Sequence, residues 1–182
     1  MKSALILIDL QNDYFPGGAM ELAGMTEAAA KARDLLAAFR QAGRPRFHVQ
    51  HIALGAGAAF FRPDTPGVEI HASVRPHPGE PVIQKHYPNA FRDTGLLETL
   101  KSTGVEEVII CGAMSHMCID ASNRAAFDFG FRCTVIHDAC ASRDLVFQGL
   151  TIPAAQVHGA FMAALGARYA RIMSVKDFLS GA

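Results

Sequence analysis

Short, unbroken apolar runs alternate along this chain with longer segments in which apolar residues recur at helical spacing. The first run, residues 4–8, reads Ala-Leu-Ile-Leu-Ile and ends at Asp9, which predicts a strand buried on both faces, as in parallel sheets. After a Pro-Gly-Gly turn, residues 26–42 predict a helix that ends at Gly43. The apolar positions that define this helix are Ala28, Ala32, Leu35, Leu36 and Phe39.

The same alternation continues to the end of the chain and predicts its fold class. Because parallel strands need crossover connections, the order predicts a Rossmann-like α/β protein: three layers, α/β/α, around a six-stranded, mostly parallel sheet. No internal repeat or linker divides the chain, so we expect a single domain over residues 1–182. The other strands are predicted at 46–52, 81–85, 106–111, 131–136 and 169–173, and the other helices at 94–103, 116–129 and 144–165, the last interrupted at Pro153, with a final helical turn after the sixth strand.

The segment 53–80 stands apart from this pattern. It is rich in Gly, Pro and Ala and follows no sustained period. In a compact domain, a stretch of this length without regular structure is usually a binding loop or an active-site lid. We therefore expect this loop to take part in function.

The composition mainly excludes classes of protein. Half of the 182 residues are hydrophobic and 19% are charged, a balance typical of chains that fold around their own core. Lys and Arg total 17, as do Asp and Glu, so no net field draws the protein onto nucleic acid or a membrane, and a small, mildly polar substrate is favoured. The sequence shows neither a stretch long enough to span a bilayer nor a cleavable signal peptide, so we expect a cytoplasmic protein.

Three groups that can carry chemistry follow predicted strand ends: Asp9, Lys85 and Cys118 in the segment 112–118. Ligands of open parallel sheets bind beyond the carboxyl ends of the strands, so these groups are predicted to meet in one cleft. Ser115 can cap the helix that follows, which would place Cys118 in its first turn, where the helix dipole lowers the pKa of a thiol. Each residue alone also has a structural interpretation: a packed cysteine, a turn-forming aspartate, and a lysine that reaches solvent.

Other patterns argue against cofactors and metals. The turn after the first strand lacks the glycines of a dinucleotide site, so neither NAD nor FAD is expected. His48 and His51 are three positions apart in a predicted strand and point to opposite faces, so they cannot share an ion. No two cysteines have the spacing of a zinc knuckle or a redox motif, and we expect free thiols, with Cys111 and Cys133 buried in strands.

Three motifs together resemble the isochorismatase-like cysteine hydrolases, the superfamily that includes nicotinamidases and N-carbamoylsarcosine amidohydrolases. They are Asp9-Leu-Gln-Asn-Asp-Tyr-Phe, Lys85-His-Tyr-Pro-Asn-Ala-Phe91 and Gly112-Ala-Met-Ser-His-Met-Cys118-Ile, and the likeness extends over nearly the whole chain. The resemblance implies a catalytic triad of Asp9, Lys85 and Cys118. It also implies a cis peptide bond between Met114 and Ser115, and an oxyanion hole formed by the N–H groups of Met114 and Cys118.

The departures from the family pattern narrow the expected activity. Nicotinamidases carry an Asp-x-His metal motif after the second strand, where this chain reads His51-Ile-Ala, so we expect no metal and no cofactor. Family members that cleave vinyl ethers generally lack the nucleophilic cysteine, so Cys118 implies acyl transfer: hydrolysis of a small amide, ureido or carbamoyl C–N bond through a thioester. The alternatives are a vinyl ether hydrolase that releases pyruvate, and a noncatalytic thiol redox sensor.

Positions beside these motifs provide candidates for the pocket. Phe15, His51, Phe91 and His116 are the predicted substrate-binding residues, with Phe60 and Phe61 as anchors of a lid. The expected partner is a small-molecule substrate, without nucleic acid or membrane. Similar family members are often oligomers, so we also expect a homo-oligomer, either a dimer or a tetramer.

Overall fold

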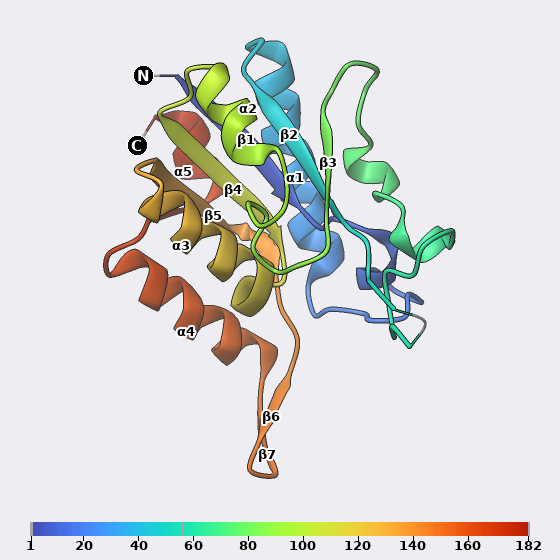
Figure 1. Cartoon of the computed structure of the whole chain (residues 1–182). Helices are drawn as coiled ribbons and strands as arrows, with labels where there is room; N and C mark the ends of the chain where they lie inside the picture. Colours follow the sequence, from blue (N-terminus) through green and yellow to red (C-terminus); the bar gives the residue numbers. More distant parts are fainter. Residues whose placement is uncertain (1, 56, 182) are drawn as a thin grey trace.

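A sheet of six parallel strands forms the centre of the computed structural model (Figure 1). The structure describes residues 2–55 and 57–181; Met1, Ala56 and Ala182, which include both ends of the predicted domain and one position of the 53–80 loop, lie outside the described residues. The strand order is β3-β2-β1-β4-β5-β8, and each pairing is parallel. The strands are β1 (Ser3–Ile8), β2 (Arg46–His51), β3 (Val82–Lys85), β4 (Glu107–Ala113), β5 (Arg132–Ala141) and β8 (Arg171–Met173).

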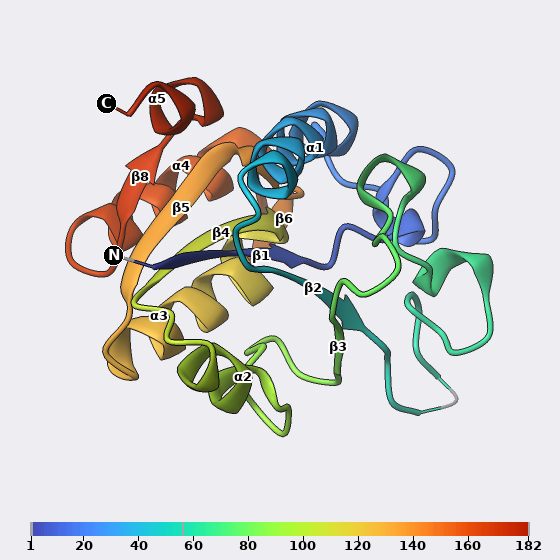
Figure 2. The ribbon, with the colours of Figure 1, turned by 90° about the horizontal axis from the view of Figure 1, so that it is seen from above.

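Helices cover both faces of this sheet, as Figure 2 shows from above. Side chains of β1 alternate between two cores, so that Leu5 and Leu7 face one side while Ala4, Ile6 and Ile8 face the other. This two-sided burial explains the unbroken apolar run, and the predicted three-layer α/β/α fold is confirmed. No helix in the described part of the chain is long and apolar enough to cross a membrane. One face carries α1 (Met25–Gln41) and α5 (Val175–Ser180); the other carries α2 (Leu96–Ser102), α3 (Asp120–Asp128) and α4 (Ala154–Gly166).

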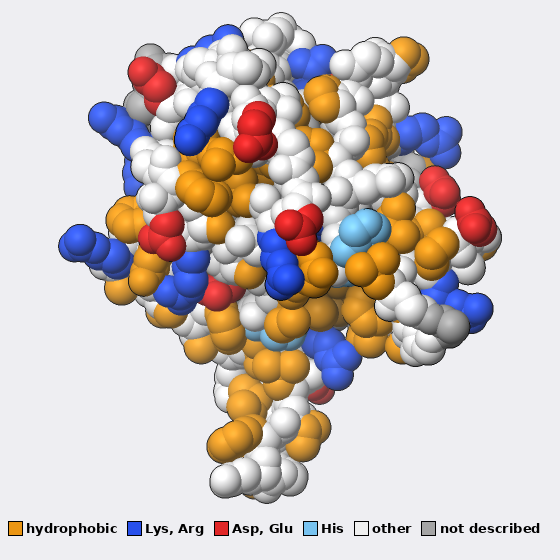
Figure 3. Space-filling model, viewed as in Figure 1, with side chains coloured by type: hydrophobic (Ala, Val, Ile, Leu, Met, Phe, Trp, Pro, Cys, Tyr) orange, Lys and Arg blue, Asp and Glu red, His pale blue; other side chains and the backbone are white. Residues whose placement is uncertain are grey.

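The predicted helix over 144–165 is wrong in its first part. The chain instead forms an antiparallel hairpin, β6 (Leu145–Phe147) and β7 (Leu150–Ile152), before α4 begins at Ala154. Gln148 and Gly149 have φ values of +51° and +78°, which suit a two-residue hairpin turn and not a helix. We call residues 145–152 the arm, because this hairpin projects from the body of the protein and carries hydrophobic side chains (Figures 1 and 3).

The fourth strand is longer than predicted, because Gly112 continues it instead of ending it. β4 runs to Ala113, with a shift of register against β5 between Ile110 and Gly112. Gly112 has a φ of +125°, and a Cβ atom at this position would lie 1.9 Å from the carbonyl oxygen of Ile8 in β1. The close approach of β1 and β4 therefore requires a residue without a side chain here.

Gly112→Ala is expected to lower the free energy of unfolding by more than about 3 kcal/mol, because the left-handed φ and the clash with Ile8 must both be relieved. The matched control is Gly43 just after α1, which has a φ of +62° and nothing within 4 Å of the added Cβ. Gly43→Ala should therefore lower stability by only about 1–2 kcal/mol. Urea unfolding measures both variants, and equal losses would contradict the close approach at Gly112.

Candidate active site

Side chains from three strand ends meet at the carboxyl edge of the sheet, beside the place where the strand order reverses between β1 and β4. Asp9 follows β1, Lys85 ends β3, and Cys118 lies in the π-helical turn Ser115–Ile119 that follows β4. Lys85 Nζ is 2.7 Å from Asp9 Oδ2 and donates to Cys118 Sγ at 3.3 Å. The three residues, which we call the triad, are 0%, 1% and 4% exposed. The structure thus brings together the groups that the strand pattern predicts to meet.

The Lys85 ammonium has three polar neighbours. Besides Asp9 and Cys118, it lies 2.8 Å from Nδ1 of His51, its register partner at the end of β2. Because an ammonium only donates, His51 Nδ1 accepts, and the neutral ring carries its proton on Nε2. Burial by itself lowers the pKa of Lys85, but Asp9 and Cys118 raise it, and the net pKa lies above the ordinary value. Lys85 therefore stays charged inside the protein.

Cys118 has a different environment from the one that its sequence position predicts. The predicted helix 116–129 begins as the π-helical turn, and Ser115 does not cap it: Ser115 Oγ donates to the Ala141 carbonyl at 3.1 Å and lies 2.8 Å from His158 Nδ1. Burial raises the pKa of Cys118, the Asp9 carboxylate raises it further, and Lys85 opposes both. The expectation of a lowered thiol pKa is therefore wrong, because loss of solvent outweighs the favourable charges. Cys118 rests as a thiol beside a carboxylate.

The cis peptide bond joins Ala113 to Met114, one position earlier than the Met114–Ser115 bond expected from the resemblance. The expected position is wrong because β4 extends to Ala113 and Ser115 already belongs to the helical turn, so the change of direction falls at Met114. Within residues 2–55 and 57–181, the Met114 N–H has no hydrogen-bond acceptor. This donor is therefore free close to Cys118.

Tyr14 is a wall of the site that the sequence patterns did not single out. It is 1% exposed, and its ring packs against Phe61 of the 53–80 loop with centroids 4.5 Å apart. Burial raises the pKa of Tyr14, and the Asp9 carboxylate raises it further. Phe61 itself is fully buried and also contacts the His51 ring, which fits its predicted role as an anchor of the loop.

Buried polar side chains just after Asp9 hold the 53–80 loop over the triad. Gln11 donates to the carbonyls of His51 and Val68 at 2.8 and 2.7 Å and accepts from the His51 N–H. Asp13 accepts from the Phe61 N–H at 2.6 Å. Sequence reasoning gave Gln11 and Asp13 no role of their own, although both lie in the first motif. Their place directly after the first strand was the one signal that could have assigned them to the site.

Asp9, His51 and Cys118 also offer three metal-ligand atoms within 4.8 Å of one another. The Lys85 ammonium already lies among them, 2.7, 2.8 and 3.3 Å from atoms of these three residues. A metal ion at ligand distances of about 2.0–2.3 Å would have to displace this ammonium. The cluster thus contains its own cation, and a metal-free site remains our prediction.

Comparison with known proteins identifies the family of this triad. A family model of the isochorismatase domain matches residues 3–177. The chain belongs to the isochorismatase family. The isochorismatase family protein YddQ of Bacillus subtilis is 51% identical over 98% of this chain and 99% of its own length. A crystal structure of an isochorismatase hydrolase from Oleispira antarctica matches with a TM-score of 0.95 and 49% identity, covering 99% of this chain and 97% of that one.

Two relatives carry names that state an activity. The streptothricin hydrolase of Streptomyces noursei is 38% identical over 90% of this chain and 59% of its own length. The maleamate amidohydrolase of Pseudomonas putida is 31% identical over 78% of this chain and 73% of its own length. The protein is therefore an isochorismatase-family hydrolase, with amidohydrolases among its relatives.

Three of the predicted pocket residues of this isochorismatase-family hydrolase have different surroundings. The His51 side chain is 18% exposed, so the cluster reaches solvent at this residue. Phe15 stacks on His71 with ring centroids 3.6 Å apart, and both line a neighbouring hollow to which no triad residue contributes. His116 Nδ1 lies 2.8 Å from Ser142 Oγ, near the base of the arm. Contact of these residues with substrate remains a prediction.

The Phe91 ring lies in an aromatic cluster at the end of α3, and its contact with substrate stays a prediction. Its ring packs against Phe129 and Phe131, with centroid distances of 5.4 and 6.5 Å. Phe129 follows the last residue of α3, whereas Cys118 lies two residues before its first. The backbone beside Phe91 docks on α3, where Ala90 N–H donates to Ser122 Oγ, four residues after Cys118.

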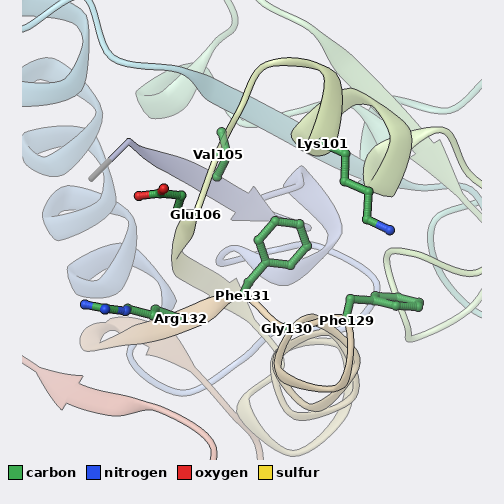
Figure 4. Close-up of a pocket in the computed structure, with 7 residues that line it drawn as sticks. All are labelled: Lys101, Val105, Glu106, Phe129, Gly130, Phe131 and Arg132. Carbon is green, nitrogen blue, oxygen red and sulfur yellow. The ribbon is translucent and has the colours of Figure 1, made fainter.

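A hollow at the opposite edge of the sheet lacks the groups of this site (Figure 4). It lies at the amino ends of β4 and β5, and the described residues that line it include no cysteine, serine or histidine. We therefore assign no chemistry to it. Its lining residues are Lys101, Val105, Glu106, Phe129, Gly130, Phe131 and Arg132.

Stability of this isochorismatase-family hydrolase is expected to fall as the pH decreases from 6.5 to about 4, through His51. Burial, and then the Lys85 charge, lower the pKa of His51 from 6.5 to about 4. The unfolded chain binds a proton below pH 6.5, while the folded protein resists until about pH 4, so protonation favours unfolding in this window. The loss amounts to about 3 kcal/mol. Urea unfolding between pH 6.5 and about pH 4 should show this loss of stability in the wild type. His51→Gln keeps a hydrogen-bond acceptor but does not titrate, so its loss should be smaller. If the stability of both proteins falls equally with pH, His51 is not the group responsible.

Proposed function

We propose that this protein is a cysteine hydrolase that cleaves a C–N bond of a small amide, ureido or carbamoyl substrate through a thioester intermediate. The observation that carries the proposal is one ammonium, Lys85, in contact with both a carboxylate and a thiol. Acyl transfer to sulfur needs a nucleophile, a base to take its proton and a charge to balance the pair. The maleamate amidohydrolase among the relatives supports C–N bond hydrolysis as the reaction class.

The first half of the reaction forms the thioester. Asp9 accepts the proton of Cys118 while Sγ attacks the carbonyl carbon, and Lys85 balances the negative charge. The electron pair of the C=O bond moves onto oxygen, which accepts hydrogen bonds from the N–H groups of Met114 and Cys118. The tetrahedral adduct then collapses, the C–N bond breaks, and Asp9 returns the proton to the leaving nitrogen as ammonia or an amine departs.

The second half restores the enzyme. Asp9 takes a proton from a water molecule whose oxygen adds to the thioester carbonyl. Collapse of this adduct breaks the C–S bond, and Cys118 regains its proton from Asp9. The acid product then leaves. The raised pKa of Cys118 fits this scheme, because the thiolate forms only as the carbonyl carbon arrives.

The walls of the site and the balanced charges of its central cluster support a small substrate. The charges of Asp9 and Lys85 cancel, and His51 is neutral. These three side chains together carry no net charge. Tyr14 and Phe61 restrict the space beside the triad, and the open edge at His51 presents an Nε2–H that can donate to a substrate oxygen.

The test is a panel of small primary amides, ureido compounds and N-carbamoyl compounds, scored by release of ammonia or amine. Acid quenching during turnover, followed by peptide mass spectrometry, should detect an acyl adduct on Cys118 and on no other cysteine. We also expect turnover to survive dialysis against a chelator. The proposal would be overturned if the protein hydrolysed no compound of the panel but released pyruvate from a vinyl ether, at the same rate before and after alkylation of Cys118.

A further inference from the structure

One continuous stretch of this chain carries no charge. Residues 145–166, which comprise the arm and α4, contain no Asp, Glu, Lys or Arg, although such residues make up 19% of the whole sequence. Surface segments of a soluble protein normally include charged side chains, especially on the outer face of a helix. A stretch of this length without any charge therefore needs an explanation.

The arm exposes its apolar side chains to solvent. Val146, Phe147 and Leu150 are 71%, 66% and 72% exposed, and all three lie on the projecting hairpin (Figure 3). A two-stranded hairpin standing alone is at best marginally stable in water. Exposed apolar groups of this size on a segment without charge are typical of a surface that another molecule covers.

The outward face of α4 continues this uncharged surface. Val157, Met162 and Leu165 are buried, His158 and Phe161 are half-buried, and the outward positions of the helix are exposed. These exposed positions carry small side chains and one amide, and they allow close approach of a second backbone. They are Ala155, Gln156, Gly159, Ala160, Ala163 and Ala164.

We infer that the arm and the outward face of α4 together form the contact between two copies of this chain. A two-fold interface places the same patch on both partners, and a patch without charge does not repel its own copy. The chain as a whole has a formal net charge of zero, so no long-range repulsion opposes association. This surface has no charged side chain with which a partner of complementary charge could pair.

The area that a stable interface needs explains why both elements take part. Each exposed apolar side chain of the arm offers on the order of 100 Å², so two arms bury several hundred Å². Stable interfaces bury about 1,200–2,000 Å², which the arms alone do not reach. The outward face of α4, which follows the arm directly in the chain, supplies the remainder.

Sedimentation of the full chain at micromolar concentration tests this inference independently of any catalytic activity. The wild type is expected at no less than twice the 19.5 kDa of one chain. The arm variant Phe147→Lys/Leu150→Lys and the helix variant Ala163→Glu should both reduce the assembly toward the monomer mass. The control is Leu54→Lys, since Leu54 is 63% exposed but lies in the 53–80 loop, and it should sediment like the wild type.

Circular dichroism should show that the variants are folded. If the arm variant fails to fold, Ala163→Glu decides, because glutamate at an exposed helical position is well tolerated. A wild type that sediments at the monomer mass would overturn the inference. An assembly that persists unchanged in the folded variants of both the arm and α4 would overturn it as well.

Discussion

Cys118→Ala is expected to lower turnover of the amide substrate by at least about 1,000-fold while the protein remains folded. The reason is chemical: without Sγ no thioester forms, and the remaining groups of the site can only position substrate and water. The loss should appear in kcat, because the nucleophile acts after substrate has bound. Removal of one buried sulfur leaves only a small cavity, so stability should fall by about 1 kcal/mol.

Cys133→Ala is the matched control for this experiment. Cys133 is 7% exposed, similar to Cys118 at 4%, but it lies near the amino end of β5, where its Sγ contacts the Asn123 and Phe131 carbonyls. Its replacement should affect stability to a similar extent and leave kcat unchanged. Comparable kcat values for wild type and Cys118→Ala on a substrate that wild type hydrolyses would rule out covalent catalysis by this residue.

The sheet could be predicted from the sequence because a parallel strand that is buried on both faces appears as a short, unbroken run of apolar residues. The run before Asp9 is apolar at every position since α1 covers one of its faces and α2 and α3 the other. The arm was missed because residues 145–152 are apolar enough to suit a helix. The signal that could have corrected this is the pair Gln148-Gly149, a turn sequence flanked by β-branched and aromatic residues.

The triad could be predicted from strand ends, but its electrostatics could not. That Lys85 and Asp9 meet follows from the sheet order, which places β2 between their strands and brings His51 to the same ammonium. The pKa of Cys118 depends on burial by segments distant in the sequence. The effect of a helix terminus on a thiol, which was the basis of the prediction, does not include this burial. The direction of the Phe91 ring likewise depends on how its loop docks on α3.

Lys85→Met is expected to impair both stability and activity, for two different reasons. The ammonium is fully buried and makes the 2.7 Å ion pair with Asp9, so its loss leaves the Asp9 carboxylate buried without a cation. Breaking a buried ion pair in this way typically lowers the free energy of unfolding by about 3–5 kcal/mol. Turnover should fall by at least about 100-fold, because no cation then balances the charge formed when Cys118 loses its proton. Lys101→Met, which removes an exposed lysine of α2, is the control and should change neither quantity appreciably.

The double variant Asp9→Asn/Lys85→Met separates these two roles of Lys85. It contains neither charge, so no ion is left unpaired, and its stability should return most of the way to that of the wild type. Its activity should not return, since both the proton acceptor and the cation are missing. Urea unfolding and turnover of the two single variants and the double variant form a complete thermodynamic cycle. If the stability losses of the single variants simply add in the double variant, the two side chains do not form an ion pair. If the double variant regains turnover, the proposed catalytic roles of Asp9 and Lys85 are wrong.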